Sequence, residues 1–217
     1  MLVLAAGARV TQVRFLPDGR LLVGTWAAGD ADLLILPLPS GPRVVIPLPA
    51  RQVWDEPNHV AVPAAGDRLY TAFGGLRSLN TADGDEPPGG PSGPANRVIV
   101  SPDGQLLVVT YPTADGGTTV YGLAGGKQTW TTAHERGLTP HPAGFLPDGE
   151  RFVLVGGNRV SVRRFADQAE EAAARYPTYN IYRPQLSPDG RHLGVVGYNS
   201  FYLYDAAAPG KPRQIKS

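Results

Sequence analysis

The stretch VTQVRFLPDGRLLVGTW, residues 10–26, sets the pattern for the whole chain. Two runs of alternating apolar residues flank the tetrapeptide Leu-Pro-Asp-Gly, and period-two alternation is typical of β-strands. Proline fixes φ at the first central position of the turn, aspartate bonds its own backbone, and glycine takes the positive φ that closes a hairpin. The stretch therefore predicts two antiparallel strands joined by a tight turn.

The same unit returns along the chain. The turn reads LPDG at 16–19 and 146–149, SPDG at 101–104 and 187–190, and PAAG, a degenerate version, at 63–66. Successive turn prolines are 46, 39, 45 and 41 residues apart, so five units of about 43 residues fill most of the 217-residue chain. The expected units cover approximately residues 10–54, 55–94, 95–138, 139–180 and 181–217.

Further strands follow each hairpin. A third run is found at 32–38, 75–80, 118–123, 159–165 and 201–206, and fourth-strand candidates stand at 43–48 and 127–132. Four short strands in about 43 residues are typical of a β-propeller blade. We therefore expect a single all-β domain over residues 1–217, a β-propeller of about five four-stranded antiparallel blades.

Two segments depart from this pattern. Residues 166–176, ADQAEEAAARY, are strong helix formers followed by a proline, which predicts a helix linking the third and fourth strands of the fourth unit. Residues 83–96 are rich in proline and glycine and predict a mobile loop.

The strand–SPDG–strand–strand unit, ending in the aromatic–Asp pair Tyr204-Asp205, resembles the WD40 repeat as kept in degenerate bacterial WD40-like and TolB-like propellers. The resemblance covers about residues 10–207. It departs from well-formed WD40 blades because no unit carries a Trp-Asp or Gly-His dipeptide, so their Asp–His–Ser/Thr–Trp hydrogen-bond network is not expected. The resemblance implies a non-catalytic scaffold for protein–protein or peptide interaction.

Closure of the ring is an open question at this stage, because an open propeller leaves exposed strand edges. Residues 1–9, which begin MLVLA, could supply the outermost strand of the last blade, and residues 212–217 are a rival for that position. A ring of five blades is allowed, but WD40 relatives usually have seven. The alternatives are therefore a closed ring, which predicts a monomer, an open ring, which predicts an oligomer, and a truncated fragment of a longer protein.

Composition excludes several classes of protein. A net charge of +1 with 18% charged residues argues against a nucleic-acid binder. No apolar run reaches the ~18 residues of a membrane-spanning helix, and the N-terminal residues lack the basic region of a signal peptide. The expected location is therefore cytoplasmic. The absence of cysteine excludes disulfides, thiol catalysis and cysteine zinc sites.

Few residues carry a chemical signal. The histidines are His59, His134, His141 and His192, and they lack the spacing of a zinc site. The repeated acids are Asp18, Asp103, Asp148 and Asp189, and each has a local role in its turn. We expect no catalytic, metal or cofactor-binding residues. The alternative is a propeller enzyme or a sugar- or lactone-binding protein that uses the central channel.

What remains is the surface made by loops between strands and between blades. Aromatic residues and arginine are enriched at binding hot spots. The candidate interaction residues are Trp26, Trp54, Tyr111, Asn158, Arg183, Tyr198 and Asn199. The expected partner is a protein or peptide.

Overall fold

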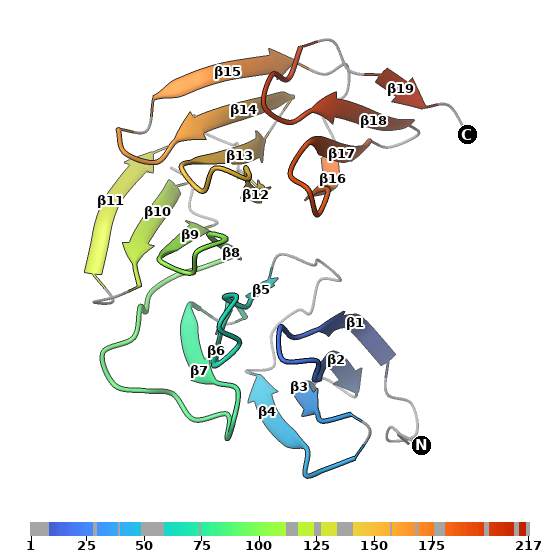
Figure 1. Ribbon diagram of the computed structural model, residues 1–217, viewed down its shortest axis with the longest axis vertical. Helices are drawn as coiled ribbons and strands as arrows, with labels where there is room; N and C mark the ends of the chain where they lie inside the picture. Colours follow the sequence, from blue (N-terminus) through green and yellow to red (C-terminus); the bar gives the residue numbers. More distant parts are fainter. Residues whose placement is uncertain are drawn as a thin grey trace.

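The computed structural model describes residues 9–27, 30–38, 40–48, 59–73, 75–111, 117–123, 127–133, 141–156, 158–167, 169–175, 181–197, 200–210 and 213–215. Within these ranges the chain forms nineteen β-strands in five antiparallel sheets (Figure 1). No helix in the described part of the chain is long and apolar enough to cross a membrane.

Each sheet is one blade of consecutive strands, and the blades are numbered here in chain order. Blade 1 contains β1 (Arg9–Phe15), β2 (Leu21–Ala27), β3 (Asp30–Leu36) and β4 (Val44–Leu48). Blade 2 contains β5 (Val60–Ala61), β6 (Arg68–Thr71) and β7 (Arg77–Asn80). Blade 3 contains β8 (Arg97–Val100), β9 (Leu106–Tyr111), β10 (Gly117–Gly122) and β11 (Lys127–Ala133). Blade 4 contains β12 (His141–Phe145), β13 (Arg151–Gly156), β14 (Arg159–Arg164) and β15 (Glu170–Arg175). Blade 5 contains β16 (Ile181–Leu186), β17 (His192–Gly197), β18 (Ser200–Asp205) and β19 (Arg213–Ile215).

The repeated turn joins the first two strands of every blade, as the sequence predicts. Its glycine has a positive φ in all five blades: 85° at Gly19, 72° at Gly66, 71° at Gly104, 70° at Gly149 and 67° at Gly190. The amide of each glycine donates a hydrogen bond of 2.8–3.0 Å to the carbonyl three residues earlier. A side chain with a Cβ is strained at such φ values, which is why glycine ends every turn.

The turn aspartates have the local role predicted for them. In the blade 3 turn, Asp103 Oδ1 accepts hydrogen bonds from the hydroxyl of Ser101 at 2.5 Å and from the amide of Gln105 at 3.1 Å. These two contacts lower the pKa of Asp103 below its usual value, because they stabilise the carboxylate. The blade 5 turn repeats both contacts through Ser187 and Asp189.

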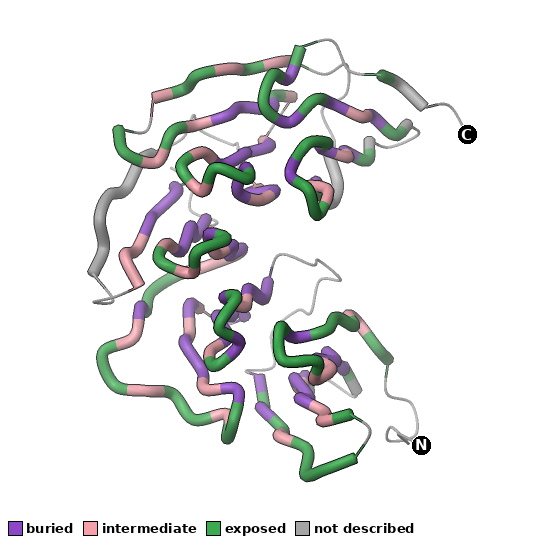
Figure 2. The backbone as a smooth tube through the Cα atoms, in the orientation of Figure 1, coloured by how far each residue is buried: buried purple, intermediate pink, exposed green. Residues whose placement is uncertain are grey.

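The apolar core is divided among the interfaces between blades. Four clusters of buried apolar side chains are found in the described residues, and each joins one blade to the next in the chain. Between blades 3 and 4, for example, Val108 and Val120 pack with Phe145 and Phe152. Figure 2 shows these buried positions along the middle of the sheets. The packing of blade on blade therefore holds the described sheets together.

The blades follow one another round an arc that does not close on itself in the described part of the chain (Figure 1). No described strand of blade 5 pairs with blade 1, and none of the four clusters joins these two blades. The innermost strand of blade 1, β1, contains no buried residue, whereas β8 and β12 contain three each (Figure 2). Blade 1 therefore has one face that no other blade covers.

The fourth strand of the last blade comes from the C-terminal alternative. Strand β19 pairs with β18 through Phe201↔Ile215, Tyr202↔Gln214 and Leu203↔Arg213. The rival segment, residues 1–8, lies outside the described residues.

The helix predicted over residues 166–176 is wrong. Glu170–Arg175 is instead strand β15, the outer strand of blade 4, which pairs antiparallel with β14. Ala172 and Ala174 alternate toward the apolar cluster between blades 4 and 5. Alternating burial and antiparallel pairing with β14 outweigh helix propensity, which amounts to only a few tenths of a kcal/mol per residue.

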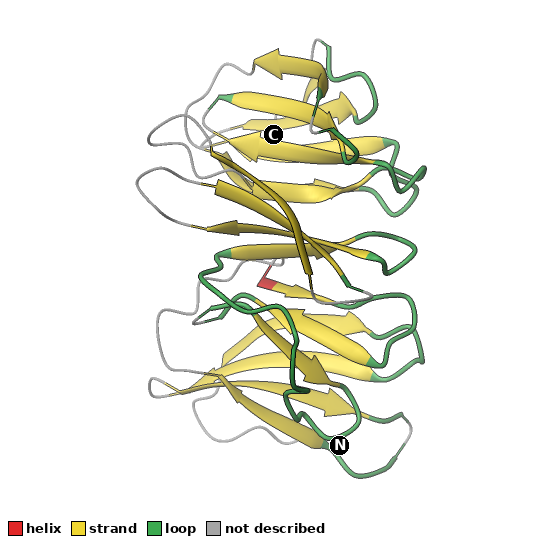
Figure 3. Ribbon diagram, turned by 90° about the vertical axis from the view of Figure 1, so that its left-hand side faces the viewer, coloured by secondary structure: helices red, strands yellow, loops and turns green. Residues whose placement is uncertain are grey.

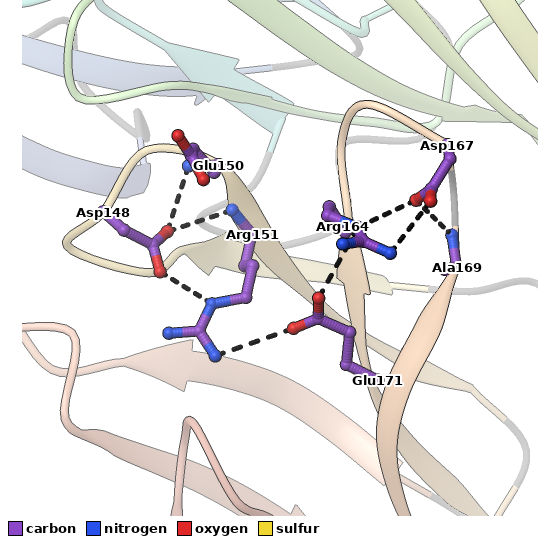
Figure 4. Close-up of polar contacts among 7 residues, drawn as sticks. All are labelled: Asp148, Glu150, Arg151, Arg164, Asp167, Ala169 and Glu171. Carbon is purple, nitrogen blue, oxygen red and sulfur yellow. Dashed lines mark hydrogen bonds and ion pairs between the residues drawn. The ribbon is translucent and has the colours of Figure 1, made fainter.

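Charged side chains on blade 4 add to this strand pairing. Glu171 of β15 lies between Arg151 Nη1 at 3.7 Å and Arg164 Nε at 3.6 Å (Figure 4). Arg164 also forms a 2.9 Å ion pair with Asp167 in the loop that precedes β15. These partly exposed pairs fix the register of the outer strand more than they stabilise the blade.

Candidate interaction surfaces

The arc has two sides, because every blade is an antiparallel meander. The turns between first and second strands and the loops between third and fourth strands lie on one side, called here the turn side (Figure 3). The ends of the second strands and the starts of the third strands lie on the other side, called here the loop side. The candidate interaction residues were expected on the loop side.

Three of the seven candidates are placed there by the structure. Trp26 lies near the end of β2 in blade 1, Tyr111 ends β9 in blade 3, and Asn158 lies between β13 and β14 in blade 4. They share the loop side of the arc but belong to different blades. Arg183 is part of β16, the innermost strand of blade 5. The remaining candidates, Trp54, Tyr198 and Asn199, lie outside the described residues.

The three loop-side candidates differ in how exposed their side chains are. Trp26 is 40% exposed. Tyr111 is half-buried over its cross-strand partner Gly117, where an added Cβ would come within 2.3 Å of the tyrosine ring. Asn158 is half-buried. Tyr111 therefore packs on its own hairpin, and Trp26 presents the largest accessible apolar surface of the three.

The hub of the arc holds an open pocket of about 460 Å³. The innermost strands of all five blades line it: β1, β5, β8, β12 and β16. The lining is mostly valine, alanine, glycine and leucine, and its polar members are Gln12, Arg14 and Gln185. Arg14 Nη1 donates a 2.8 Å hydrogen bond to the carbonyl of Val60 in blade 2. That contact joins the first two blades at the hub.

On the turn side, the repeated turns touch one another in series. Gly66 lies beside Pro17 of the preceding blade, and a Cβ built on this glycine would be 3.5 Å from the proline ring. Gly104 lies beside Pro63 in the same way, at 3.3 Å. Arg20 reinforces the first of these contacts by donating to the carbonyl and hydroxyl oxygens of Thr81 in blade 2, at 2.6 and 2.8 Å.

The series of turn contacts is interrupted between blades 3 and 4. Among the described residues, no atom beyond the adjacent ones lies within 4 Å of a Cβ built on Gly149, and a groove of about 540 Å³ opens there. Pro102, Leu106 and Phe165 supply apolar lining. The charged residues that line the groove are Asp103, Asp148, Glu150 and Arg164. The carboxylate of Asp103 is already used by its own turn.

The histidines occupy separate places in the fold. His59 is buried and meets the ring of Phe73 edge-on, with 4.9 Å between the ring centres. His141 begins β12 in blade 4, and His192 begins β17 in blade 5. His134 lies outside the described residues. Over the ranges that the structure describes, no group of three or more His, Asp or Glu side chains is arranged to hold a metal ion.

Two solved structures are similar to this chain over almost its whole length. A chain in the crystal structure of a mitotic checkpoint complex matches 99% of this chain and 67% of its own length, with a TM-score of 0.73 and 14% identity. The Cps50 (Swd1) β-propeller domain of Myceliophteria thermophila matches 100% of this chain and 74% of its own length, with a TM-score of 0.72 and 12% identity. The fold is a β-propeller.

The β-propeller fold expected from the sequence is therefore confirmed. No protein-family model matches the sequence, and no curated protein matches it. Five blades of this propeller align with 74% of the Cps50 (Swd1) propeller domain. The aligned domain is therefore longer than this arc by about a quarter of its own length.

Sequence reasoning missed one surface, the exposed rear face of blade 1, which is the face turned away from blade 2. Val13 is 59% exposed and Phe15 is 70% exposed. The apolar alternation over residues 10–15 does not predict this exposure, because the first blade has the same apolar pattern as a blade with neighbours on both sides. Only the open arc reveals that these side chains have no covering sheet.

Proposed function

We propose that this protein is a non-catalytic propeller scaffold that binds a protein or peptide on its loop side. The observation that supports this most strongly is Trp26, a large aromatic side chain that is 40% exposed at the loop-side end of β2. A tryptophan held on a rigid strand loses little conformational entropy on binding, and tryptophan is enriched at binding hot spots. The neighbouring chains, from a mitotic checkpoint complex and from Cps50 (Swd1), share the propeller architecture that would present it.

The alternative of a propeller enzyme or small-molecule binder places its ligand in the hub. The described lining offers one guanidinium, from Arg14, and the amides of Gln12 and Gln185 among apolar side chains. Glycoside hydrolysis needs two carboxylates that flank the scissile bond. The chemistry of this lining therefore favours the scaffold over a hydrolase.

A peptide-display selection tests the scaffold directly. Peptides from a random library would be selected on the wild-type protein, and their affinities measured for the wild type, Trp26→Ala and Leu38→Ala. Leu38 is a matched control, because it is 55% exposed, apolar and in the same blade, but lies beyond β3 on the turn side. We expect Trp26→Ala to weaken binding by about tenfold or more, as a hot-spot truncation does, and Leu38→Ala to leave it unchanged.

Peptides that bind all three proteins equally would contradict a loop-side site at Trp26. A thermal-shift screen with divalent ions and simple sugars tests the alternative in parallel. A shift with a sugar that disappears in Arg14→Ala would favour the hub-binding alternative over the scaffold.

A further inference from the structure

Successive turns touch at three of the four junctions between described blades, but not at the junction of blades 3 and 4. Gly66, Gly104 and Gly190 each lie beside a proline of the preceding turn, with a built Cβ 3.5, 3.3 and 2.6 Å from that proline. The matching pair at the open junction is Pro102 and Gly149, and both line the groove of about 540 Å³. Blades 3 and 4 each have a neighbouring blade on both sides. The opening of this blade 3–4 groove is therefore a property of the inner blades and not of the ends of the arc.

The repeat position that bridges the first junction is apolar at the blade 3–4 groove. The amides of Thr81 and Phe165 donate to the carbonyl of the residue after the turn glycine of their own blade, at 3.0 and 2.7 Å, so the two residues occupy the same place. The Thr81 hydroxyl accepts a 2.8 Å hydrogen bond from Arg20 of the preceding blade. A phenyl ring has no hydroxyl, so Phe165 offers blade 3 an apolar surface at the place where Thr81 binds blade 1.

The floor of the blade 3–4 groove is apolar. Leu106 of blade 3 and Phe165 of blade 4 are partly buried and pack against the apolar cluster between the two blades. Pro102 and Ala166, which are exposed, extend this floor toward solvent. An apolar concave surface with a few polar groups at its edge is the usual form of a binding site, and ligand pockets have volumes of about 300–1,000 Å³. The groove therefore has room for an apolar side chain of a partner.

The positive charge that lines the groove is already neutralised. Arg164 is the one basic side chain in the described lining. Its guanidinium donates to both carboxylate oxygens of Asp167, at 3.0 and 2.9 Å, and lies 3.6 Å from a carboxylate oxygen of Glu171 (Figure 4). Arg164 is therefore bound within its own blade, with two carboxylates around its single charge.

Two carboxylates on opposite blades remain open to a cation. Asp103 of blade 3 accepts both of its turn hydrogen bonds through Oδ1, and no other described residue donates to its Oδ2. The carboxylate of Glu150 in blade 4 forms no hydrogen bond or ion pair with the described residues (Figure 4). The third acid, Asp148, is paired with Arg151 at 2.6 Å. The groove therefore offers negative charge from both of the blades that form it.

We propose that the blade 3–4 groove binds a short segment of a partner protein in which an apolar side chain is flanked by basic side chains. The apolar side chain packs on Leu106 and Phe165, and the flanking lysine or arginine side chains pair with Asp103 and Glu150. Opposite charges fix the register of such a segment and speed its association. The same carboxylates repel polyanions, so the groove does not suit nucleic acid or an anionic membrane. This turn-side site is separate from the loop-side site at Trp26, and neither depends on the other.

Labelled peptides of defined sequence test the groove on the full chain. The probes are fluorescein-labelled hexapeptides Gly-Arg-X-Arg-Gly-Ser, in which X is leucine, isoleucine, phenylalanine or proline. Each has an acidic counterpart with glutamate for both arginines and a polar counterpart with serine for X. Fluorescence anisotropy would measure their dissociation constants. We expect at least one arginine peptide to bind about tenfold or more tightly than both counterparts, and to bind more weakly as the salt concentration rises from about 0.05 to 0.5 M.

Two groove variants have matched controls in the repeat. Ala166→Trp fills the groove from an exposed position, and Ala207→Trp adds the same ring at the matching exposed position of blade 5. Each of these alanines follows the residue that donates to the carbonyl after the turn glycine. Glu150→Lys reverses a groove charge, and Asp67→Lys reverses the charge at the matching position of blade 2. Ala166→Trp and Glu150→Lys are each expected to weaken binding of the selected peptide by about tenfold or more, whereas the two controls and Trp26→Ala leave its dissociation constant within about twofold.

Circular dichroism and urea midpoints show whether each variant folds, and where one groove variant unfolds the other decides. Arginine peptides that bind no more tightly than their acidic counterparts would overturn the proposal, as would full binding by a folded Ala166→Trp or Glu150→Lys protein. An equal loss in the Ala207→Trp control would mean that the added ring acts elsewhere than in the groove, and would also overturn it. Loss of binding in Trp26→Ala alone would place the peptide on the loop side, which contradicts the groove and leaves the proposed function standing.

Discussion

Truncating two phenylalanines at the same repeat position should have very unequal effects on stability. Phe145 is 7% exposed, clusters with Ile99, Val108 and Val120 of blade 3, and lies 5.9 Å from the ring of Phe152. Replacing a buried phenylalanine by alanine costs about 3–5 kcal/mol, the sum of lost transfer free energy and the cavity left behind. Phe15 is 70% exposed, so Phe15→Ala should change the free energy of unfolding by no more than about 0.5 kcal/mol.

Urea denaturation at low micromolar concentration or below, followed by both tryptophan fluorescence and circular dichroism, measures the difference. For a chain of this length, about 2–4 °C of melting temperature accompanies each kcal/mol, so Phe145→Ala should also melt about 6–20 °C lower than Phe15→Ala. Equal losses in the two variants would refute the reasoning, because they would mean that the rear face of blade 1 is as well covered as that of blade 4.

Three further predictions concern the turns and the contacts between them. Gly190→Ala should destabilise the protein more than Gly149→Ala, since both force a Cβ into positive φ at about 1–2 kcal/mol, but only Gly190 also meets the proline ring of the preceding turn; urea midpoints of the two variants measure this. Asp103→Asn should make the free energy of unfolding depend less on pH in the acid range. The lowered pKa of Asp103 in the folded state contributes stability above the pKa that this carboxyl has in the unfolded chain, and that stability is lost as the pH falls through the pKa of the folded state. If the slope of unfolding free energy against pH below pH 5 stayed the same, this would count against the turn contact. Thr81→Val removes a hydroxyl that accepts from Arg20 at 2.8 Å and should cost about 1–3 kcal/mol, whereas Thr81→Ser should restore most of the loss.

The fold was largely predictable because the repeat acts through local chemistry. Proline, aspartate and glycine each have one role in the turn, and those roles do not depend on the rest of the molecule, as the φ of 71° at Gly104 and the bonds to Asp103 illustrate. Alternation then predicts strands wherever one side of a sheet is buried. The all-β class, the hairpins and the blade count follow from these two signals.

The wrong helix shows where local signals fail. Residues 170–175 contain glutamate, alanine and arginine, which favour a helix in isolation. Their strand conformation depends on the edge of β14 and on arginines that come from two other strands, Arg151 and Arg164. Contacts with other strands determine the conformation of this segment, and helix propensity takes no account of such contacts.

The interaction surfaces were less predictable for a related reason. Trp26 and Tyr111 both lie at or next to the end of a second strand, yet the ring of Tyr111 rests on Gly117 while Trp26 stays 40% exposed. The difference depends on which residue stands across the hairpin. Whether an apolar face is covered depends on the neighbouring blade, so the exposed rear face of blade 1 required the three-dimensional arc.

The open arc itself is tested most directly by distances between spin labels, which go only where cysteines are introduced because the chain has none. Ser40, Ala82 and Ala207 are exposed and follow the third strands of blades 1, 2 and 5. The pairs Ser40→Cys/Ala82→Cys and Ser40→Cys/Ala207→Cys would be measured by pulsed electron paramagnetic resonance, with labelled protein diluted into unlabelled protein. The open arc predicts a clearly longer distance for the second pair. Similar distances for both pairs, as in a closed ring of five equivalent blades, would contradict it.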